Sequence, residues 1–216
     1  MSSKNVLIIS PHPDDLEIGM GGTVAKLVSE GANVVSFVVT DGRNSTNNLG
    51  ISGEELAAVR KNEVEKSSKI LGISRLISLG LSEIKSEENM KYFSQKLSQF
   101  FSDFKPNEIY IPHPEIDKHK THNIISKIVL ETIKNNNIKC LCWCYEVWSS
   151  FPFYDRLEDI TNFADKKALA INQHKSQLSY KDYTKGIMGL NKYRAVFNDF
   201  YKSDDIEFAE VFIKFN

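Results

Sequence analysis

Short apolar runs alternate with longer amphipathic segments along the first two thirds of the chain. The apolar runs are rich in β-branched and aromatic residues, and their lengths suit buried strands over 6–9, 34–39, 76–79, 109–111 and 140–147. Segments of helical period lie between them, over 19–30, 52–71, 87–104 and 122–135, and stop signals such as Gly31, Gly72 and Pro106 follow. Strands and helices in alternation predict an α/β fold with a mostly parallel sheet.

Beyond residue 147 the pattern weakens. It predicts helices over 164–175 and 180–201 and a terminal strand over 206–215, where apolar and polar residues nearly alternate. No Pro- or Gly-rich linker and no repeat interrupts the chain. We therefore expect one domain over 1–216.

Composition and charge narrow the class of partner. A chain of 216 residues with 41% apolar residues can bury one good core. Charged residues make up 25%, the two signs are interspersed, and the formal net charge is −1. Because nucleic acids and membrane surfaces attract basic clusters, we expect a small-molecule partner, no nucleic-acid binding and no stable membrane insertion. Assembly into a homo-oligomer is compatible with this composition.

No targeting segment is visible at the N-terminus. The apolar stretch over 5–10 is too short for a signal-peptide core or a membrane span, so a cytoplasmic location is expected. The three cysteines, Cys140, Cys142 and Cys144, fall on one face of a strand. Their spacing suits neither a disulfide nor a zinc knuckle, and we interpret them as small buried hydrophobes in a reducing compartment.

A dense polar cluster follows the first predicted strand. His12, Asp14, Asp15 and Glu17 lie within six residues, between two prolines and a glycine-rich stretch. Adjacent carboxylates repel each other, and a divalent cation would relieve that repulsion. Histidine and carboxylate are ordinary zinc ligands. A helix N-cap would explain one Asp at this point, but four ionisable groups favour a functional site.

A second polar cluster follows the fourth predicted strand, over 112–122. It holds three of the five histidines, and His119 and His122 lie three residues apart, so that both can face one point from one helical turn. Parallel sheets bind ligands beyond the carboxyl ends of their strands. We therefore expect the two clusters to form one shared site.

The glycines in the first cluster are typical of a nucleotide-binding loop. Gly19, Gly21 and Gly22 follow the strand, but the G-x-G-x-x-G fingerprint is absent. The loop is also acidic and would repel a pyrophosphate. We therefore expect no nucleotide cofactor.

At these residues the sequence resembles the PIG-L / LmbE-like family of zinc-dependent N-acetylglucosaminyl deacetylases. The first hallmark is Pro11-His-Pro-Asp-Asp-x-Glu17, and the second is Asp117-x-His-x-x-His122. Supporting matches lie at 40–42, 60–63, 174–177 and 208–212. The likeness runs in order along nearly the whole chain.

The resemblance implies a Rossmann-like sheet with helices on both faces. It implies a zinc ion, with Fe²⁺ or another divalent metal as alternatives, held by His12, Asp15 and His122. It also implies Asp14 as the general base and His119 as a partner of the transition state.

The same resemblance implies roles for two further residues, and the sequence departs from it at a third. Arg60 is similar to the family's substrate-contacting arginine, and Asp117 is expected to support the site. The sequence departs from the family at Thr121, where Asp is common. An acidic residue there would tune the neighbouring histidines, so the charge state of His119 stays open.

Two imidazoles and one carboxylate leave a zinc ion one position for water, as in catalytic sites. The resulting hypothesis is hydrolysis of an acetyl group from an N-acetylated amino sugar or its conjugate, similar to N-acetylglucosamine. In it, Asp14 takes a proton from zinc-activated water and delivers it to the leaving amine. Aromatic residues that either line a sugar pocket or pack as an apolar loop are Trp148, Phe151, Phe153 and Tyr154.

Two other functions fit the same residues. A metal-dependent phosphoesterase also uses Asp, His and divalent metals, although such sites often hold two ions and basic phosphate clamps. The first cluster has no Lys or Arg, and only Lys118 and Lys120 adjoin the second. A non-catalytic sugar-binding protein is the other alternative, and Asp14, a carboxylate beyond those needed for ligation, argues against it.

Overall fold

Seven strands form one sheet in the order β3-β2-β1-β4-β5-β7-β6. The computed structural model describes residues 3–198 and 205–215 of the chain. The strands are β1 Asn5–Ser10, β2 Asn33–Thr40, β3 Arg75–Leu81, β4 Glu108–Pro112, β5 Leu141–Tyr145, β6 Arg156–Asp159 and β7 Ala209–Phe215. The first five run parallel, and β7 is antiparallel to both of its neighbours.

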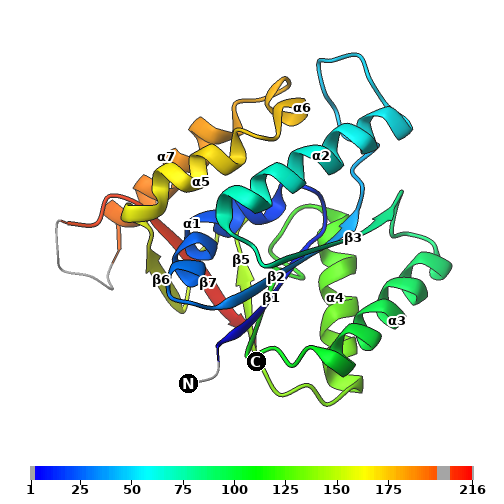
Figure 1. Ribbon diagram of the computed structural model, residues 1–216. Helices are drawn as coiled ribbons and strands as arrows, with labels where there is room; N and C mark the ends of the chain where they lie inside the picture. The colour runs from blue at the N-terminus through cyan, green and yellow to red at the C-terminus, as the bar shows by residue number, and fades with distance from the viewer. Residues whose placement is uncertain (1–2, 199–204, 216) are drawn as a thin grey trace.

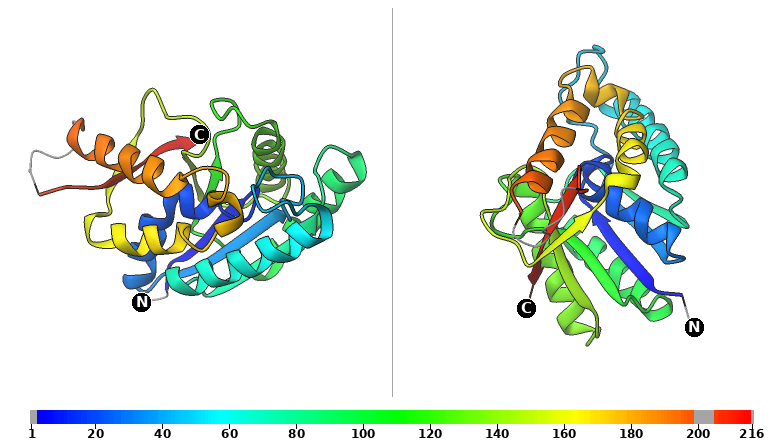
Figure 2. Two further views of the ribbon diagram at one scale, coloured as in Figure 1. Left: turned by 90° about the horizontal axis from the view of Figure 1, so that it is seen from above. Right: turned by 90° about the vertical axis from the view of Figure 1, so that its left-hand side faces the viewer.

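Helices cover both faces of this sheet (Figures 1 and 2). They are α1 Asp15–Ser29, α2 Gly53–Leu71, α3 Glu87–Asp103, α4 Lys120–Asn135, α5 Ala164–Ile171, α6 Lys175–Leu178 and α7 Tyr183–Val196, with a short 3₁₀ helix η1 at Thr161–Phe163. Helices α3 and α4 pack on one face, while α1, α2 and α5 pack on the other. The predicted mostly parallel α/β sheet is therefore confirmed.

Alternation along the central strands supplies two separate cores. In β1, Leu7 and Ile9 pack towards α3 and α4, while Val6 and Ile8 pack towards α1. Since β1 is buried on both faces, its sequence is an unbroken apolar run rather than an alternating one. Strands β2 and β4 are buried in the same way, which explains why these strands are the easiest to recognise in the sequence.

The observed elements differ from the predicted ones in several places. Strand β6 was not predicted, because only Leu157 among its four residues is a buried apolar side chain. Helix α1 begins at Asp15 rather than residue 19. The helix predicted over 180–201 spans Tyr183–Val196, and its last predicted residues lie outside the described part of the chain. The predicted strand over 206–215 begins at Ala209.

The three cysteines are free thiols on β5 and beside it. Cys142 and Cys144 are buried and Cys140 is half-buried, as the alternating pattern predicts. Burial raises the pKa of Cys140 to about 11 and that of Cys142 to about 12, so both stay protonated near neutral pH. In the described ranges, we find no helix whose length and apolar character would let it cross a bilayer.

Candidate functional site

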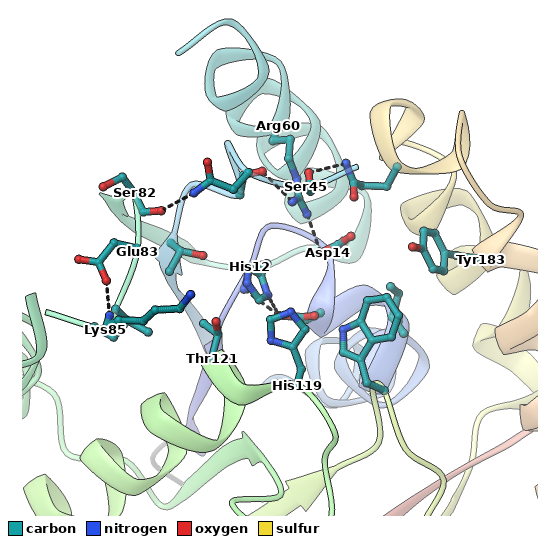
Figure 3. A pocket seen from close by; sticks show the side chains of 18 residues that line it. His12, Asp14, Ser45, Arg60, Ser82, Glu83, Lys85, His119, Thr121 and Tyr183 are labelled. Carbon is teal, nitrogen blue, oxygen red and sulfur yellow. Dashed lines mark hydrogen bonds and ion pairs between the residues drawn. The ribbon is translucent and has the colours of Figure 1, made fainter. Parts of the chain in front are cut away.

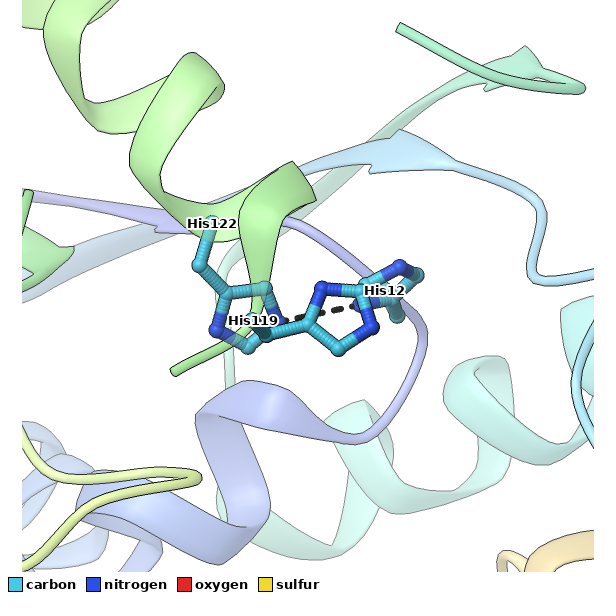
Figure 4. A group of neighbouring side chains, drawn as sticks. All are labelled: His12, His119 and His122. Carbon is cyan, nitrogen blue, oxygen red and sulfur yellow. Dashed lines mark hydrogen bonds between the residues drawn. The ribbon is translucent and has the colours of Figure 1, made fainter. Parts of the chain in front are cut away.

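Both polar clusters meet where the strand order changes direction. Strands β1 and β4 are neighbours, but the chain leaves them towards opposite sides of the sheet, which opens a crevice at their carboxyl ends. His12 follows β1 directly, and His119 and His122 lie at the start of α4, just after β4. Figure 4 shows the three imidazoles facing one another. The expected convergence of the two clusters is thus present.

Three candidate ligand atoms form a nearly equilateral triangle. His12 Nδ1 lies 3.1 Å from His122 Nε2 and 3.1 Å from Asp15 Oδ2. His122 Nε2 lies 3.2 Å from the same Asp15 oxygen. Around a tetrahedral zinc ion with bonds of about 2.0–2.1 Å, ligand atoms lie about 3.3 Å apart. The observed separations therefore fit three ligands of one such ion.

Asp117 holds His122 in the orientation that this fit requires. Its Oδ2 lies 3.2 Å from His122 Nδ1 and accepts the backbone N–H of Trp148 at 3.3 Å, and its Oδ1 accepts the backbone N–H of His119 at 2.7 Å. A carboxylate on one ring nitrogen places the lone pair on the other, which here is Nε2, facing Asp15. Asp117 therefore contacts His122 on α4 and His119, the residue just before this helix.

Positive charge is strongly favoured between these groups. Burial alone would raise the pKa of Asp15, but His122 and His12 lower it well below its usual value. Burial alone would lower the pKa of His122, but Asp15 and Asp117 raise it to about 10. A buried carboxylate facing two imidazoles therefore attracts a cation, which is a proton or a metal ion.

His119 completes the group of imidazoles. Its ring centroid lies 4.9 Å from that of His12 and 4.7 Å from that of His122. Within the described chain, these three histidines form a group that could hold a metal ion, with ligand atoms within 4.8 Å of one another. Burial, followed by the charges of His12 and His122, lowers the pKa of His119 to about 4. His119 is therefore neutral near pH 7 and can donate a single N–H.

Asp14 and Arg60 form a buried pair beside the histidines. Arg60 Nη2 donates to Asp14 Oδ1 at 2.7 Å and lies 3.3 Å from the carbonyl oxygen of Pro13. Nη1 donates to the carbonyl oxygen of Gly42 at 3.3 Å. The Arg60 side chain is only 2% exposed. The guanidinium thus has three contacts within the protein, and the Arg60 side chain also lines the pocket described below.

Helix α1 presents Asp15 from a short first segment. The helix is broken at Met20, where the backbone dihedral angles are not helical. Glu210 of β7 accepts the backbone N–H groups of Gly22 and Thr23, at 3.0 Å and 2.7 Å, and so caps the second segment. Lys167 of α5, fully buried, donates to the same carboxylate at 2.7 Å.

The glycines of the first cluster serve packing. A Cβ at Gly19 would lie 2.3 Å from the ring of Tyr145, and a Cβ at Gly22 would lie 2.6 Å from Ile160. The absence of side chains here lets α1 approach β5 and the segment before η1.

Two members of the polar clusters lie outside the site. Glu17 is buried behind it, where it accepts from Ser67 Oγ and lies 3.6 Å from His174 Nε2. His113 Nδ1 accepts the backbone N–H groups of Glu115 and Ile116, both at 3.1 Å, and so stabilises the turn after β4.

An open pocket of about 220 Å³ lies over the candidate ligands (Figure 3). His12, Asp14, Asp15 and His119 line it. Trp148 also lines it, 46% exposed, with its ring 6.0 Å from that of His119.

The other aromatic residues named from the sequence do not line this pocket. Phe151 is buried in the core. Phe153 is exposed, and Tyr154 is half-buried. Only Trp148 among the four therefore faces the pocket.

Sequence reasoning missed several pocket residues. Lys85 lies in the connection after β3, at the same sheet edge as the two clusters, so the strand-end rule could have found it. Tyr183 comes from α7 and stacks edge-on against Trp148, with ring centroids 6.2 Å apart. No signal marks Tyr183, because α7 reaches the site only through tertiary packing.

Comparison with known families gives one match. The profile of the PIG-L family, described as GlcNAc-PI de-N-acetylase, matches residues 7–133, more than half of the chain. That span includes every candidate ligand described above.

Curated relatives that are similar in sequence include two deacetylases. Diacetylchitobiose deacetylase of Thermococcus kodakarensis is 46% identical over 76 residues, 35% of this chain and only 28% of that protein. The probable N-acetyl-alpha-D-glucosaminyl L-malate deacetylase 2 of Bacillus cereus is 26% identical over 184 residues, 81% of this chain and 84% of that protein.

Solved structures that share the fold include a deacetylase and a hydratase. N,N'-diacetylchitobiose deacetylase from Pyrococcus horikoshii superposes with a TM-score of 0.80 at 24% identity, over 99% of this chain and 84% of that one. GalB, the 4-carboxy-2-hydroxymuconate hydratase of Pseudomonas putida, has the same TM-score at 17% identity, over 99% of this chain and 96% of that one. A deacetylase and a hydratase thus share this architecture, so the function must be argued from the site.

Proposed function

The chain belongs to the PIG-L family, and from this membership and the site geometry we propose that it is a metal-dependent deacetylase of N-acetylglucosamine-type substrates. The observation that carries the proposal is the triangle of His12 Nδ1, Asp15 Oδ2 and His122 Nε2, with sides of 3.1, 3.1 and 3.2 Å. Three such atoms at the base of an open pocket suit a catalytic ion rather than a structural one, which would have four protein ligands.

His12, Asp15 and His122 would hold the ion, and zinc agrees best with two imidazoles and one carboxylate. When bound, the ion would polarise the acetamide carbonyl and lower the pKa of a water molecule to about 7. Asp117 keeps His122 directed at this position through its 3.2 Å contact with Nδ1.

Asp14 is the proposed proton carrier. One of its oxygens is bound by Arg60, and the side chain lines the pocket beside the ligand Asp15. Asp14 would take a proton from the attacking water as the new C–O bond forms. It would then deliver that proton to the amide nitrogen as the C–N bond breaks, releasing acetate and a free amine.

His119 is the proposed donor to the oxyanion. Its ring lines the pocket next to His12 and His122, and its low pKa keeps the imidazole neutral. A neutral imidazole donates one N–H, and a fixed donor of this kind stabilises the negative oxygen of a tetrahedral intermediate. Removing the charge from His119 also avoids repulsion with a nearby metal ion.

The pocket agrees with an amino-sugar substrate. Its volume of about 220 Å³ is smaller than the roughly 300–1,000 Å³ of sites for drug-sized ligands. The half-exposed Trp148 offers an apolar face of the kind that packs against a sugar ring. The two relatives described above are named as a diacetylchitobiose deacetylase and a probable N-acetyl-alpha-D-glucosaminyl L-malate deacetylase.

The phosphoesterase alternative finds less support in the site. Arg60 lines the pocket, but its guanidinium is bound by Asp14 and two backbone carbonyls. A phosphoryl clamp needs cations directed at the substrate. A purely sugar-binding role leaves the Asp14–Arg60 pair without a purpose.

The test is release of acetate and of a new primary amine from a panel of N-acetylglucosamine conjugates, with parent protein and with Asp14→Asn. We expect equal amounts of the two products from the parent, and strong loss in the variant. Phosphate release from a generic ester without acetate release would favour the phosphoesterase. Sugar binding without either product in metal-loaded protein would favour a binding protein.

A further inference from the structure

The segment 174–177, which the sequence singled out, takes no part in the chemistry described above. It consists of His174 and most of the short helix α6. The His174 side chain is buried, and within the described part of the chain neither of its ring nitrogens has a hydrogen-bond partner. Its ion-pair partner is Glu17, whose Oε1 lies 3.6 Å from His174 Nε2. The imidazole is therefore directed at this carboxylate.

Glu17 belongs to the first segment of α1, which is too short to be rigid by itself. The segment begins at Asp15 and ends at the break at Met20, where the backbone dihedral angles are not helical. A single helical turn is unstable in isolation, because it fixes many dihedral angles for few hydrogen bonds. The orientation of this segment therefore depends on the contacts of its side chains.

Two carboxylates hold the segment from opposite sides. Residues two apart on a helix point about 200° apart, since 3.6 residues complete a turn. Asp15 faces the two imidazoles of the candidate metal site. Glu17 faces the other way, where its Oε1 accepts from Ser67 Oγ of α2 and lies beside His174. A buried carboxylate requires such partners, because a lone charge is costly to bury.

His174 is itself held in place, because α6 is bound to α2. The backbone N–H and the hydroxyl of Ser176 donate to the two carboxylate oxygens of Glu63, at 2.8 Å and 2.7 Å, and both residues are buried. Arg60, one helical turn before Glu63, binds Asp14. One face of α2 thus fixes both α6 and the loop that carries Asp14, and His174 contacts Glu17 from a fixed position.

We propose that His174 is a positioning residue of the metal site, which holds Glu17 and thereby fixes the ligand Asp15 on the same segment of α1. The inference rests on the proposed function, because it takes His12, Asp15 and His122 as the ligands. Residues that orient metal ligands commonly change metal affinity by about 10- to 100-fold when they are replaced. His174 does not line the pocket, so this role is separate from substrate contact.

The experiment compares two amide side chains that differ in length. His174→Gln places an amide N–H near the position of Nε2, whereas His174→Asn is shorter and places it near the position of Nδ1, away from Glu17. Equilibrium dialysis gives the affinity for Zn²⁺, and hydrogen exchange reports the backbone of residues 15–19 in metal-free protein. Leu97→Ala is the matched control for stability, because Leu97 of α3 is fully buried in the core on the opposite face of the sheet.

We expect His174→Asn to bind Zn²⁺ roughly 10- to 100-fold more weakly than the parent. Hydrogen exchange of residues 15–19 should be faster in this variant, because their anchor is lost. His174→Gln should keep most of the affinity, since it keeps a donor for Glu17. Leu97→Ala should lower Tm through the cavity it leaves but bind Zn²⁺ as the parent does.

Equal affinity in His174→Asn and the parent, or equal losses in the Asn and Gln variants, would mean that His174 serves packing alone. Should His174→Asn not fold, Ser67→Ala decides, because it removes the other partner of the same Glu17 oxygen and is a small change. A weaker affinity in folded Ser67→Ala supports the proposal, and parental affinity overturns it. Absence of bound Zn²⁺ in the parent would instead contradict the proposed function itself.

Discussion

Replacing Arg60 by Met distinguishes two roles for this residue, substrate contact and positioning of Asp14. The structure supports positioning, because the guanidinium donates to Asp14 Oδ1 at 2.7 Å and lies 3.3 Å from the carbonyl oxygens of Pro13 and Gly42. The Arg60 guanidinium has little free space around it. A Cβ at Gly42 would lie 2.1 Å from Arg60 Nη1, so only glycine leaves room for the guanidinium there.

The expected loss follows from the bond that is removed. A hydrogen bond to a charged group contributes about 1.5–3 kcal/mol. A general base contributes roughly 10²–10⁴-fold to the rate. If Asp14 loses its anchor but keeps its carboxylate, part of that factor is lost, and we expect kcat to fall by about 10- to 100-fold, or roughly 1.4–2.7 kcal/mol. If the guanidinium acts only by positioning Asp14, KM should change by less than about threefold.

The assay is steady-state acetate release by parent, Arg60→Met, Asp14→Asn and the double variant. If Arg60 acts through Asp14, the double variant should be no slower than Asp14→Asn alone, since residues that act as a unit are non-additive. Arg43→Met is the matched control, because Arg43 pairs with Asp41 and Glu54 outside the pocket. It should keep kcat within about twofold, as a surface substitution does.

Three results would refute this reasoning. A rise in KM of tenfold or more with kcat unchanged would mean that Arg60 contacts the substrate after all. Additive losses in the double variant would mean that Arg60 and Asp14 act independently. A thermal melt of each variant shows whether the fold is kept, and a folded Arg60→Met with parental kcat would also exclude positioning.

Three further substitutions test the site and its scaffold. Asp14→Asn should keep the metal by elemental analysis and lose roughly 10²–10⁴-fold in acetate release, and a parental rate would remove Asp14 from the mechanism. Lys167→Met leaves the buried Glu210 carboxylate without its cation, which should lower the free energy of unfolding by about 3–5 kcal/mol. At about 2–4 °C per kcal/mol, calorimetry should show a Tm lower by roughly 6–20 °C, and a shift under about 2 °C would contradict this. Gly19→Ala places a Cβ 2.3 Å from the Tyr145 ring, so urea denaturation should show a free energy of unfolding lower by about 1–3 kcal/mol, and an unchanged midpoint would mean that α1 can move away.

The central strands were predictable because burial on both faces leaves a strong local signal. Val6 to Ile9 are all fully buried, and β2 and β4 show the same pattern. Strand β6 lacks such a signal, because it is a four-residue edge strand that forms only by pairing with β7 from far along the chain. Local sequence carries no information about that pairing.

The start of α1 shows how charge can mislead a sequence prediction. Adjacent carboxylates between prolines and glycines indicate a loop, yet Asp15 and Glu17 occupy the first turn of the helix. The partial positive charge at a helix N-terminus favours acidic residues there. The break at Met20 could not be predicted from the local sequence either, because the carboxylate that caps the helix segment after it belongs to Glu210 of β7.

In the site, strand-end logic was sufficient for the residues next to strands. It predicted that the two polar clusters meet across more than a hundred positions, while the choice of His12, Asp15 and His122 came from the family resemblance. The structure places the candidate ligand atoms of these three residues 3.1–3.2 Å apart. It could not determine what Arg60 meets, since α2 approaches Asp14 only in the folded molecule. The direction of a long side chain depends on tertiary contacts rather than on its own sequence neighbours.

The most direct test of the account is equilibrium dialysis of Zn²⁺ against parent protein, His122→Ala and His113→Ala. His113 is the matched control, because its Nδ1 accepts backbone N–H groups of the turn after β4 and lies outside the group of three histidines. We predict one ion per chain in the parent and in His113→Ala, and an affinity at least about 100-fold lower in His122→Ala. No bound ion in the parent, or equal affinity in all three proteins, would contradict the central claim that His12, Asp15 and His122 form one metal site.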